Sequence, residues 1–376
     1  MSVRKRKWQT SNGEYKEAWQ VDYTDQAGNR RSKQFTRKKD ADAWLTRARF
    51  EIVSGVHTPD SQSVTVAEAG ALWIARAEAN ALERSTLKQY EAHKRLHIDP
   101  YLGPVKLSRL TTVRIEQYLD VLLATRSRAM AKKVLRSLTM ILSEARRRGL
   151  IAQNVARDIK IKGNSRDKSV TEIPSNEEIR EILHAASEDE RALVMTLVMT
   201  GLRSSELRGL RWRDIDFELR TISISQRADN WATIGNPKSR SARRTIPLPS
   251  MLISELTAWR KIAPYSSMDL VFPNGKGNPQ NPSNLVQRIL NPIQLRAGVT
   301  KMAKSGAMKA KYSPHAFRHA AASRWIKKGA DFKRIQKWMG HENVELTLQT
   351  YGHLIEDRNL DMNLMESDAL DLVPRA

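Results

Sequence analysis

Six side chains that could act together on a phosphodiester lie in four short stretches of the C-terminal half of the sequence. They are Arg203, Lys238, His315, Arg318, His341 and Tyr351. Each lies next to an expected helix end, proline or turn, and residues at such boundaries often face a cleft rather than a core. Any one of them has an ordinary structural explanation, but their conjunction in one segment predicts a single cationic site that contains a tyrosine.

The stretch TGLRSSELRGLRWRDID places the first arginine at a helix boundary. An apolar helix should end at Gly201, which leaves Arg203 in the turn before the next helix. Glu206 opens that helix and is the expected partner of Arg203, either in support of a site or as a simple ion pair. The stretch NPKSRSARRTIPLP predicts a hairpin with Lys238 near its tip, where this lysine could also be a solvated charge.

The stretch SPHAFRHAAASRW predicts a helix whose first turn carries polar groups. Ser313 can cap this helix, and Pro314 suits its first position. His315 and Arg318 are three residues apart and therefore share a face. They lie at the end of the helix whose free N–H groups and dipole favour an anion.

The stretch KWMGHENVELTLQTYGHL holds the last two candidates. Gly340 should end a helix, with His341 immediately after it and Tyr351 further along. Val344, Leu348 and Tyr351 recur at helical spacing, so this tyrosine on its own favours a core position. A catalytic role for it depends on the other stretches.

These stretches resemble the tyrosine site-specific recombinases, the phage-integrase family, in order and spacing across roughly residues 170–356. The matching motifs are TGLRSSEL, PKS before RRTIPLP, SPHAFRH and MGHENVELTLQTYGHL. Two departures, Ala316 for a frequent acidic residue and Ser239 for a frequent threonine, fall outside the catalytic positions. The resemblance implies that Tyr351 is the nucleophile and that the other five side chains surround the phosphate. The implied activity is that of an integrase, which cleaves and rejoins DNA through a 3′-phosphotyrosyl link to integrate or excise a phage or mobile element at attachment sites.

Elementary chemistry agrees with these implied roles. Arginine forks bind phosphoryl oxygens bidentately and stay charged, which makes Arg203 and Arg318 the natural clamp. A tyrosine with a pKa near ~10 is mostly protonated at neutral pH, so His315 is expected to accept its proton. His341 would donate to a non-bridging oxygen, and Lys238 would protonate the departing 5′-oxygen. This mechanism needs no metal, ATP or other cofactor, and the sequence has no G-x-x-x-x-G-K-[ST] loop.

The charge of the chain indicates a polyanionic partner. Lysine and arginine total 64 against 41 aspartate and glutamate residues, a net charge of +23 over 376 residues. Nucleic acid is the leading partner; an anionic membrane surface competes, but no long basic amphipathic helix with an aromatic face is evident. The longest apolar run is too short for a membrane span, and no secretory signal follows the basic N-terminus. The absence of cysteine favours a reducing, cytoplasmic compartment.

The sequence predicts a mainly α protein with small β elements (α+β), arranged in three modules. Residues 1–58 should form a small three-stranded sheet with one helix, residues 64–160 a helical bundle, and residues 174–357 a mixed α/β catalytic domain. Residues 161–173 are typical of a linker, and residues 358–376 of a tail with spaced leucines. By resemblance, the first module is an arm-type and the second a core-type DNA-binding domain, although the first could equally be an ordinary small domain with a basic face.

Within the third module, helices are expected at about residues 176–200 and 204–212, with strands near RTISISQ and RRTIPLP. Basic residues outside the apolar stripes, together with two arginines near Lys238, are candidate DNA contacts, although such residues are also common on any surface. The candidates are Arg4, Lys5, Arg6, Lys7, Lys88, Lys94, Arg95, Lys132, Lys133, Arg136, Arg240 and Arg243.

Double-stranded DNA is the expected partner, and a homotetramer is expected on it because recombination joins two duplexes. Accessory DNA-bending or directionality factors are further candidate partners, and the tail would dock on a neighbouring protomer. Three alternatives stay open: a type IB topoisomerase with nearly the same residues, a DNA-binding architectural protein with an inactive site, and a metal-dependent nuclease.

Overall fold

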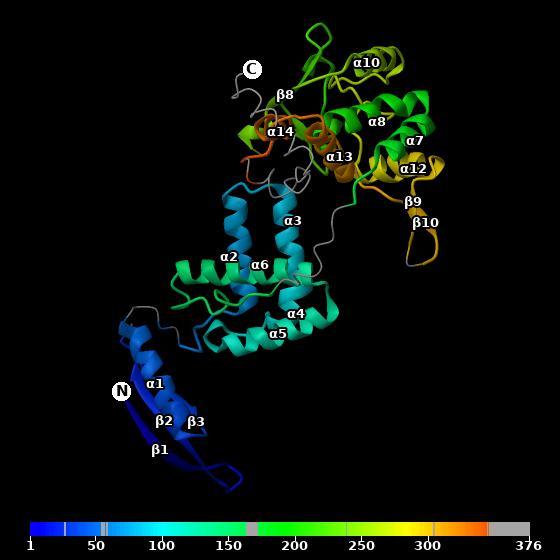
Figure 1. Cartoon of the computed structure of the whole chain (residues 1–376). Coiled ribbons are helices and arrows are strands. Elements are labelled where there is room, and N and C mark those ends of the chain that lie inside the picture. The colour runs from blue at the N-terminus through cyan, green and yellow to red at the C-terminus, as the bar shows by residue number, and fades with distance from the viewer. Residues whose placement is uncertain are drawn as a thin grey trace, which may run out of the picture. The chain divides into compact units, whose positions relative to one another are not determined.

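The computed structural model describes residues 1–25, 28–53, 57, 59–162, 172–237, 239–303, 305–343 and 345. The chain divides into two compact units, residues 1–167 and residues 168–376. The described elements are mostly helices, accompanied by small antiparallel sheets (Figure 1). This architecture confirms the mixed, mainly α fold class expected from the sequence.

The N-terminal unit begins with a three-stranded antiparallel sheet in the order β1–β2–β3. Its strands are β1 (Ser2–Gln9), β2 (Tyr15–Thr24) and β3 (Arg30–Phe35), and α1 (Lys38–Val53) follows them. Val21 of the central strand packs against Ala41 and Leu45 of α1. The sheet and this helix therefore share a small apolar core of their own.

The rest of the N-terminal unit is helical. Its elements are α2 (Val66–Ala79), α3 (Arg84–His93), the π-helix η1 (Lys94–Ile98), α4 (Asp99–Leu102), η2 (Leu107–Arg109), α5 (Thr112–Thr125) and α6 (Arg128–Arg147). Ser127 caps α6, whose stripe of Val134, Leu138 and Ile141 is fully buried. Helices α2 and α5 pack against α6. This apolar stripe is thus the centre of the bundle.

The C-terminal unit is built around α8 (Glu188–Thr200), whose residues from Ala192 to Leu197 are all buried. A helix that is apolar on every side must be surrounded, and α10 (Ser250–Ile262) and α13 (Pro314–Lys327) pack against it. The other helical elements are α7 (Asn176–Ala185), α9 (Ser204–Arg208), η4 (Trp212–Asp214), η5 (Arg240–Ala242), α11 (Pro282–Asn284), η6 (Leu285–Leu290), α12 (Asn291–Arg296) and α14 (Phe332–Met339).

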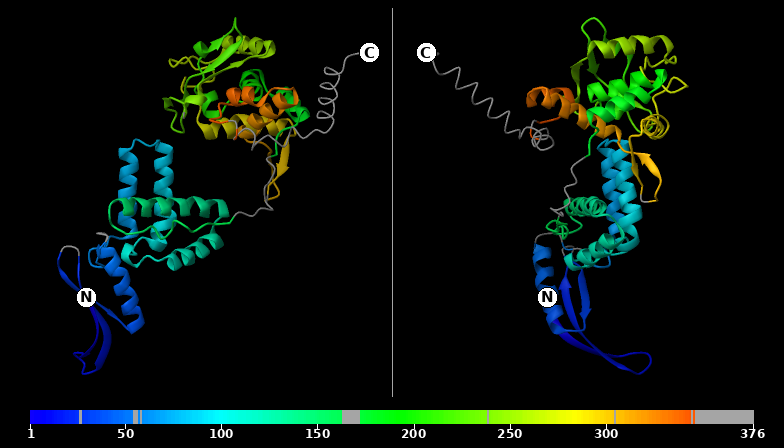
Figure 2. Two further views of the ribbon diagram at one scale, coloured as in Figure 1. Left: turned by 60° about the vertical axis from the view of Figure 1, so that its left-hand side comes forward. Right: turned by 45° about the vertical axis from the view of Figure 1, so that its right-hand side comes forward.

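The described residues of this unit also form three small sheets. Strands β4 (Ile215–Asp216), β5 (Thr221–Ile224) and β8 (Arg244–Pro247) form one sheet in that order. The two-stranded ladders are β6 (Arg227–Ala228) with β7 (Ile234–Gly235), and β9 (Thr300–Met302) with β10 (Met308–Ala310). Figure 2 shows the β9–β10 ribbon extending away from the helices of its unit.

Two local predictions are wrong in detail. The helix expected over residues 176–200 is two helices, because Ser187 and Glu190 form a capping box that begins α8. The helix expected over residues 204–212 ends at Arg208, where Gly209 lies too close to Ala228 to allow a Cβ atom.

The hairpin expected around Lys238 also differs. Strands β5 and β8 pair with each other, but the β6–β7 ladder is inserted between them and turns at residues 229–233. The hairpin formed by the two predicted strands is thus interrupted, and Lys238, which was expected near its tip, lies outside the described residues. The sequence signal located the strands correctly but did not distinguish one hairpin from two nested ladders.

We predict that Gly201→Ala lowers the free energy of unfolding by about 1–3 kcal/mol. Gly201 ends α8 with a φ of 59°, and an added Cβ would lie 3.2 Å from Cβ of Ala321 and 3.4 Å from Sδ of Met339. Gly298→Ala is the matched control, because its φ is 68° but nothing lies within 4 Å of an added Cβ. Urea denaturation should show a smaller loss for the control; equal losses would contradict the packing argument.

Candidate active site

The turn after α8 places Arg203 at the start of α9, as the sequence predicts. Its Nη1 donates to Oε1 of Glu206 at 2.8 Å, and its backbone N–H donates to Oε2 at 2.9 Å. Its Nη2 donates to the carbonyl oxygen of Gly340 at 3.0 Å. The side chain remains 35% exposed, so part of the guanidinium faces solvent, where it could bind an anion.

Helix α13 brings a second arginine to the same turn. Pro314 is its first residue and Ser313 its N-cap as predicted, although the Ser313 hydroxyl makes no capping bond. Arg318 is 2% exposed and donates to the carbonyl oxygens of Gly201 (2.7 Å) and Met339. Both acceptors lie at helix C-termini, where carbonyls lack helical partners and the dipole favours a cation.

A buried carboxylate connects this cluster to β8. Glu206 is 2% exposed, and both of its oxygens accept hydrogen bonds from Arg244 at 2.8–2.9 Å. Burial alone would raise the pKa of Glu206, but hydrogen bonds and charge from Arg244, followed by the charges of Arg203 and Arg318, lower that pKa to about 2. The carboxylate is therefore ionised throughout the physiological range.

The histidines of the cluster are held neutral. Burial, followed by the charges of Arg318 and Arg203, lowers the pKa of His341 to about 4. The same causes lower the pKa of His315 near the start of α13, although part of its side chain reaches solvent. His319 has a pKa lowered to about 4 by burial and by His315, whose ring centroid lies 4.7 Å from its own. A neutral imidazole can donate one proton and accept another, which suits general acid–base catalysis.

The structure thus brings together Arg203, Glu206, His315, Arg318 and His341, which the sequence placed in three separate stretches. Lys238 and Tyr351 lie outside the described residues, as do residues 358–376 and most of the expected linker. Arg240 opens η5, and only its backbone is described. The catalytic roles of Lys238 and Tyr351, the DNA contact of Arg240 and the docking role of residues 358–376 stay predictions.

Two members of the cluster were missed by sequence reasoning, and each had a signal. Arg244 alternates with exposed neighbours in β8 and shares the buried face of the strand with Ile246. An arginine in phase with apolar strand residues predicts a buried charge that needs a carboxylate. His319 follows His315 by four residues on a helix, the spacing at which two side chains become neighbours.

The basic residues proposed as DNA contacts are in varied settings. On β1, Arg4 pairs with Asp22, Lys5 and Lys7 pair with Glu17, and Arg6 donates to Gln20. Lys94 is half-buried and pairs with Asp99 at 2.7 Å. Lys88, Arg95, Lys132, Lys133, Arg136 and Arg243 are exposed, as are the four candidates on β1. Exposed cations can contact a polyanion, whereas Lys94 has mainly a structural contact.

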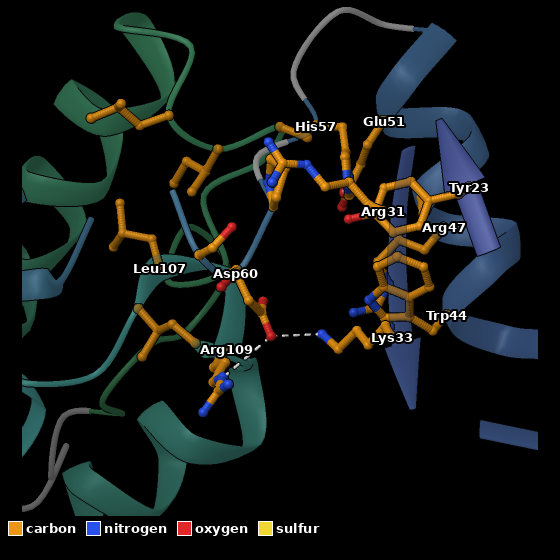
Figure 3. Close-up of a pocket in the computed structure, with 18 of the residues that line it drawn as sticks. Tyr23, Arg31, Lys33, Trp44, Arg47, Glu51, His57, Asp60, Leu107 and Arg109 are labelled. Atoms are coloured by element: carbon orange, nitrogen blue, oxygen red, sulfur yellow. Dashed lines mark hydrogen bonds and ion pairs between the residues drawn. The ribbon is translucent and has the colours of Figure 1, made fainter. Parts of the chain in front are cut away.

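A cavity of about 620 Å³ lies in the N-terminal unit, apart from the residues of the catalytic cluster. Figure 3 shows Asp60 between Lys33 of β3 and Arg109 of η2, with which it forms ion pairs of 2.8 and 3.4 Å. Burial opposes ionisation of Asp60, but Lys33, Ser108 and Arg109 lower its pKa overall. The carboxylate thereby joins the sheet module to the helices beside it.

Comparison with known proteins agrees with this geometry. The family model described as "Phage integrase family" matches residues 174–358, and that of the "Phage integrase, N-terminal SAM-like domain" matches residues 65–123. A "Tyrosine recombinase XerC-like" protein of Caldanaerobacter subterraneus subsp. tengcongensis is 30% identical over 353 residues, which cover 85% of this chain and 86% of the relative.

Solved structures show the same fold. The integrase of transposon Tn1549, in complex with a circular intermediate DNA, has a TM-score of 0.67 at 20% identity and covers 81% of this chain and 100% of its own. A lambda integrase tetramer bound to a Holliday junction has a TM-score of 0.60 at 18% identity, covering 92% of this chain and 94% of its own.

The fold, together with the family match and the relatives, defines a DNA strand-transfer enzyme. The chain belongs to the phage integrase family of tyrosine recombinases, which cleave and rejoin DNA strands in site-specific recombination. The helices in the described part of the chain are all too short or too polar to cross a lipid bilayer.

We predict that the stability of the protein falls as the pH is lowered from about 6.5 to about 4. The pKa of His341 is about 4 in the folded state against an ordinary value of 6.5. Between pH 6.5 and pH 4 the unfolded chain binds more protons than the folded protein. The stability that neutral His341 contributes is therefore complete above pH 6.5 and is lost as the pH falls through 4. It amounts to at most about 3 kcal/mol.

Urea denaturation across this pH range should show a shallower slope for His341→Asn. The matched control is His184→Asn, because His184 is exposed near the end of α7 and should leave the slope unchanged. The same slope in the wild type and in His341→Asn would contradict the assignment.

Proposed function

We propose that this protein is an integrase in which Tyr351 attacks a DNA phosphodiester held by the cluster around Glu206. The observation that carries the proposal concerns the C-terminal ends of helices α8 and α14. Arg203 donates to the carbonyl oxygen of Gly340, and Arg318 donates to that of Gly201. His341 directly follows Gly340 in the chain. Such preorganised donors stabilise the charge that develops on phosphoryl oxygens. Lys238 and Tyr351 enter by their positions in the family motifs.

The proposed reaction proceeds in two balanced steps. The Tyr351 hydroxyl passes its proton to neutral His315 while its oxygen forms a bond to phosphorus. The bond from phosphorus to the 5′-oxygen breaks, and Lys238 protonates the leaving oxygen to give a free 5′-hydroxyl. In the second step a 5′-hydroxyl of a partner strand gives its proton to the now neutral Lys238 while its oxygen forms a bond to phosphorus. The bond from phosphorus to the tyrosine oxygen breaks, and protonated His315 returns its proton to that oxygen. His341, neutral because its pKa is lowered to about 4, donates to a non-bridging oxygen throughout.

The proposed substrate is double-stranded DNA at attachment sites of a phage or other mobile element, which places the protein in the cytoplasm. The net charge of +23 supports binding of a polyanion with a strong dependence on salt. The proposed assembly on DNA is a homotetramer, and the neighbours bound to DNA as dimers and tetramers support it. Accessory bending or directionality factors remain candidate partners.

The assignment of a function to each module is also a proposal. The modules at residues 1–58 and 64–160 would bind arm-type and core-type DNA, and residues 174–357 would cleave it. Residues 161–173 would span between the second and third modules. The matches of family models to residues 65–123 and 174–358 support the assignments of the modules at residues 64–160 and 174–357.

The central prediction is that Tyr351→Phe abolishes the covalent protein–DNA adduct and leaves DNA binding within about twofold. A library of nicked duplexes with randomised sequence is the probe, because a nick lets the cleaved fragment diffuse away and traps the adduct. The wild-type protein should become attached to DNA and enrich one sequence. An adduct with Tyr351→Phe would assign the nucleophile elsewhere, whereas relaxation of plasmids without the enriched sequence would favour a topoisomerase.

We also predict that deletion of residues 358–376 leaves the first cleavage intact but reduces tetramer assembly and strand exchange. The spaced leucines of this tail would dock on a neighbouring protomer. Gel filtration of the protein on the enriched DNA measures assembly, and the nicked substrate measures cleavage. Unchanged assembly and recombination in the truncated protein would refute the docking role.

A further inference from the structure

Arg244 contacts three segments of the catalytic unit from one buried guanidinium. Its Nη1 and Nη2 form a fork on the two oxygens of Glu206, at 2.9 and 2.8 Å. Its Nη1 also donates to the Ala242 carbonyl oxygen, and its Nε donates to that of Trp338 at 2.6 Å. The side chain is 1% exposed. Helix α9, the turn η5 and helix α14 are therefore all held by one residue of β8.

The burial of Arg244 distinguishes it from the arginines that could bind DNA. Arg203 is 35% exposed, and two of its five N–H groups are used by Glu206 and Gly340. Arg244 commits Nε, Nη1 and Nη2 to neighbouring protein groups. Because its guanidinium is covered and committed, Arg244 is placed to act on other residues rather than on a phosphate.

We propose that Arg244 is a positioning residue for strand cleavage, which occupies the fork of Glu206 and so keeps the Arg203 guanidinium available to the DNA phosphate. Arginine and carboxylate prefer the bidentate, fork-to-fork arrangement. Arg244 occupies it, and Arg203 donates a single side-chain bond to the same carboxylate. Without Arg244, Glu206 would turn its fork to Arg203 and engage the N–H groups that the phosphate needs.

A second contact supports the same role. The φ of Gly340 is 61°, and a Cβ added there would lie 3.0 Å from Nη1 and 3.1 Å from Cδ of Arg244. The Gly340 carbonyl oxygen accepts a hydrogen bond from Arg203, and His341 is the next residue. The Arg244 side chain thus packs directly against the turn at Gly340. This turn carries the carbonyl oxygen that accepts a bond from Arg203 and, at His341, the proposed proton donor. This inference rests on the proposed cleavage site.

The test compares Arg244→Lys with Arg208→Lys in the full-length protein. Lysine keeps the charge but cannot form a fork. Arg208 is the matched control, because it is 3% exposed at the end of the same helix α9 but donates to the carbonyl oxygens of Ala228, Asp229 and Gln280 rather than to Glu206. Adduct formation is measured in a single turnover with saturating protein on the enriched nicked duplex, and DNA binding and thermal unfolding are measured in parallel.

We expect Arg244→Lys to slow cleavage by roughly 10- to 100-fold with binding within a few-fold, as for a displaced catalytic group. Its effect should also be coupled to Arg203: the double variant Arg203→Lys with Arg244→Lys should be no slower than Arg203→Lys alone. Arg208→Lys combined with Arg203→Lys should instead show independent, multiplicative losses. Multiplicative losses for Arg244→Lys would overturn the positioning role.

The pH dependence of cleavage gives a readout that a general loss of stability would not move. The groups that face Glu206 are Arg203 at the start of α9, Arg244 on β8 and Arg318 on α13, with His341 beyond them. Burial raises the pKa of Glu206, and the charge of Arg244 lowers it. Arg244→Gln removes that charge, so the pKa of Glu206 should rise. Protonated Glu206 would then appear as an acid limb at higher pH than in the wild type, and an unchanged profile would contradict the proposal.

A paired variant guards against simple misfolding. Glu206→Gln with Arg244→Met removes both charges of the buried pair and leaves the net charge of the cluster unchanged. It should unfold near the wild-type temperature and, because no carboxylate is left to engage Arg203, cleave faster than Arg244→Lys; cleavage no faster than in Arg244→Lys would overturn the inference. If the wild-type protein itself formed no adduct with any nicked duplex, the proposed function would fail instead, so the two failures are distinguishable.

Discussion

The arrangement of the catalytic unit depends on one buried carboxylate that faces three guanidinium groups. A buried ion pair adds little net stability, because the cost of removing two charges from water offsets their attraction. Its effect is geometric: breaking it leaves an uncompensated charge, so alternative arrangements of the neighbouring segments become costly. Glu206 therefore specifies where the start of α9, strand β8 and the arginines must lie relative to one another.

The second constraint comes from helix ends. Helices α8 and α14 each end at a glycine with positive φ, Gly201 and Gly340. Their last carbonyls have no helical partners, and arginines supply the missing donors: Arg318 to Gly201 and Met339, and Arg203 to Gly340. The same bonds that satisfy the helix ends also place the guanidinium groups. Stability of the unit and geometry of the site thus rely on the same contacts.

Sequence reasoning located the parts of the site that depend on local signals. Helix ends at Gly201 and Gly340 and the first position of Pro314 follow from backbone preferences, and the structure confirms them. Contacts between distant segments were beyond such signals. Arg244 and Glu206 are far apart in the sequence, and no local pattern states which carboxylate a buried arginine will meet. The alternation of Arg244 with exposed residues in β8 predicts its burial but not its partner.

The detailed errors have the same origin. Residues 176–200 carry a continuous helical pattern, yet the capping box of Ser187 with Glu190 divides them, since a capped helix start competes with continuation. The β6–β7 ladder lies between β5 and β8, and its Ala228 is approached closely by Gly209, which is a tertiary contact. In both cases a specific hydrogen bond or a close approach of two backbone segments, rather than the local sequence preference, determined the structure.

The charge balance of the site explains why a phosphate would complete it. Three arginines surround Glu206, and one carboxylate cannot neutralise all of them. Burial, together with this positive field, keeps His315, His319 and His341 neutral by lowering their pKa values. A phosphodiester entering this field brings the missing negative charge, and its arrival makes protonation of a nearby imidazole easier. Binding of the DNA would therefore raise the basicity of His315 just when a proton must leave the tyrosine, so that substrate charge and acid–base chemistry are linked through one electrostatic field.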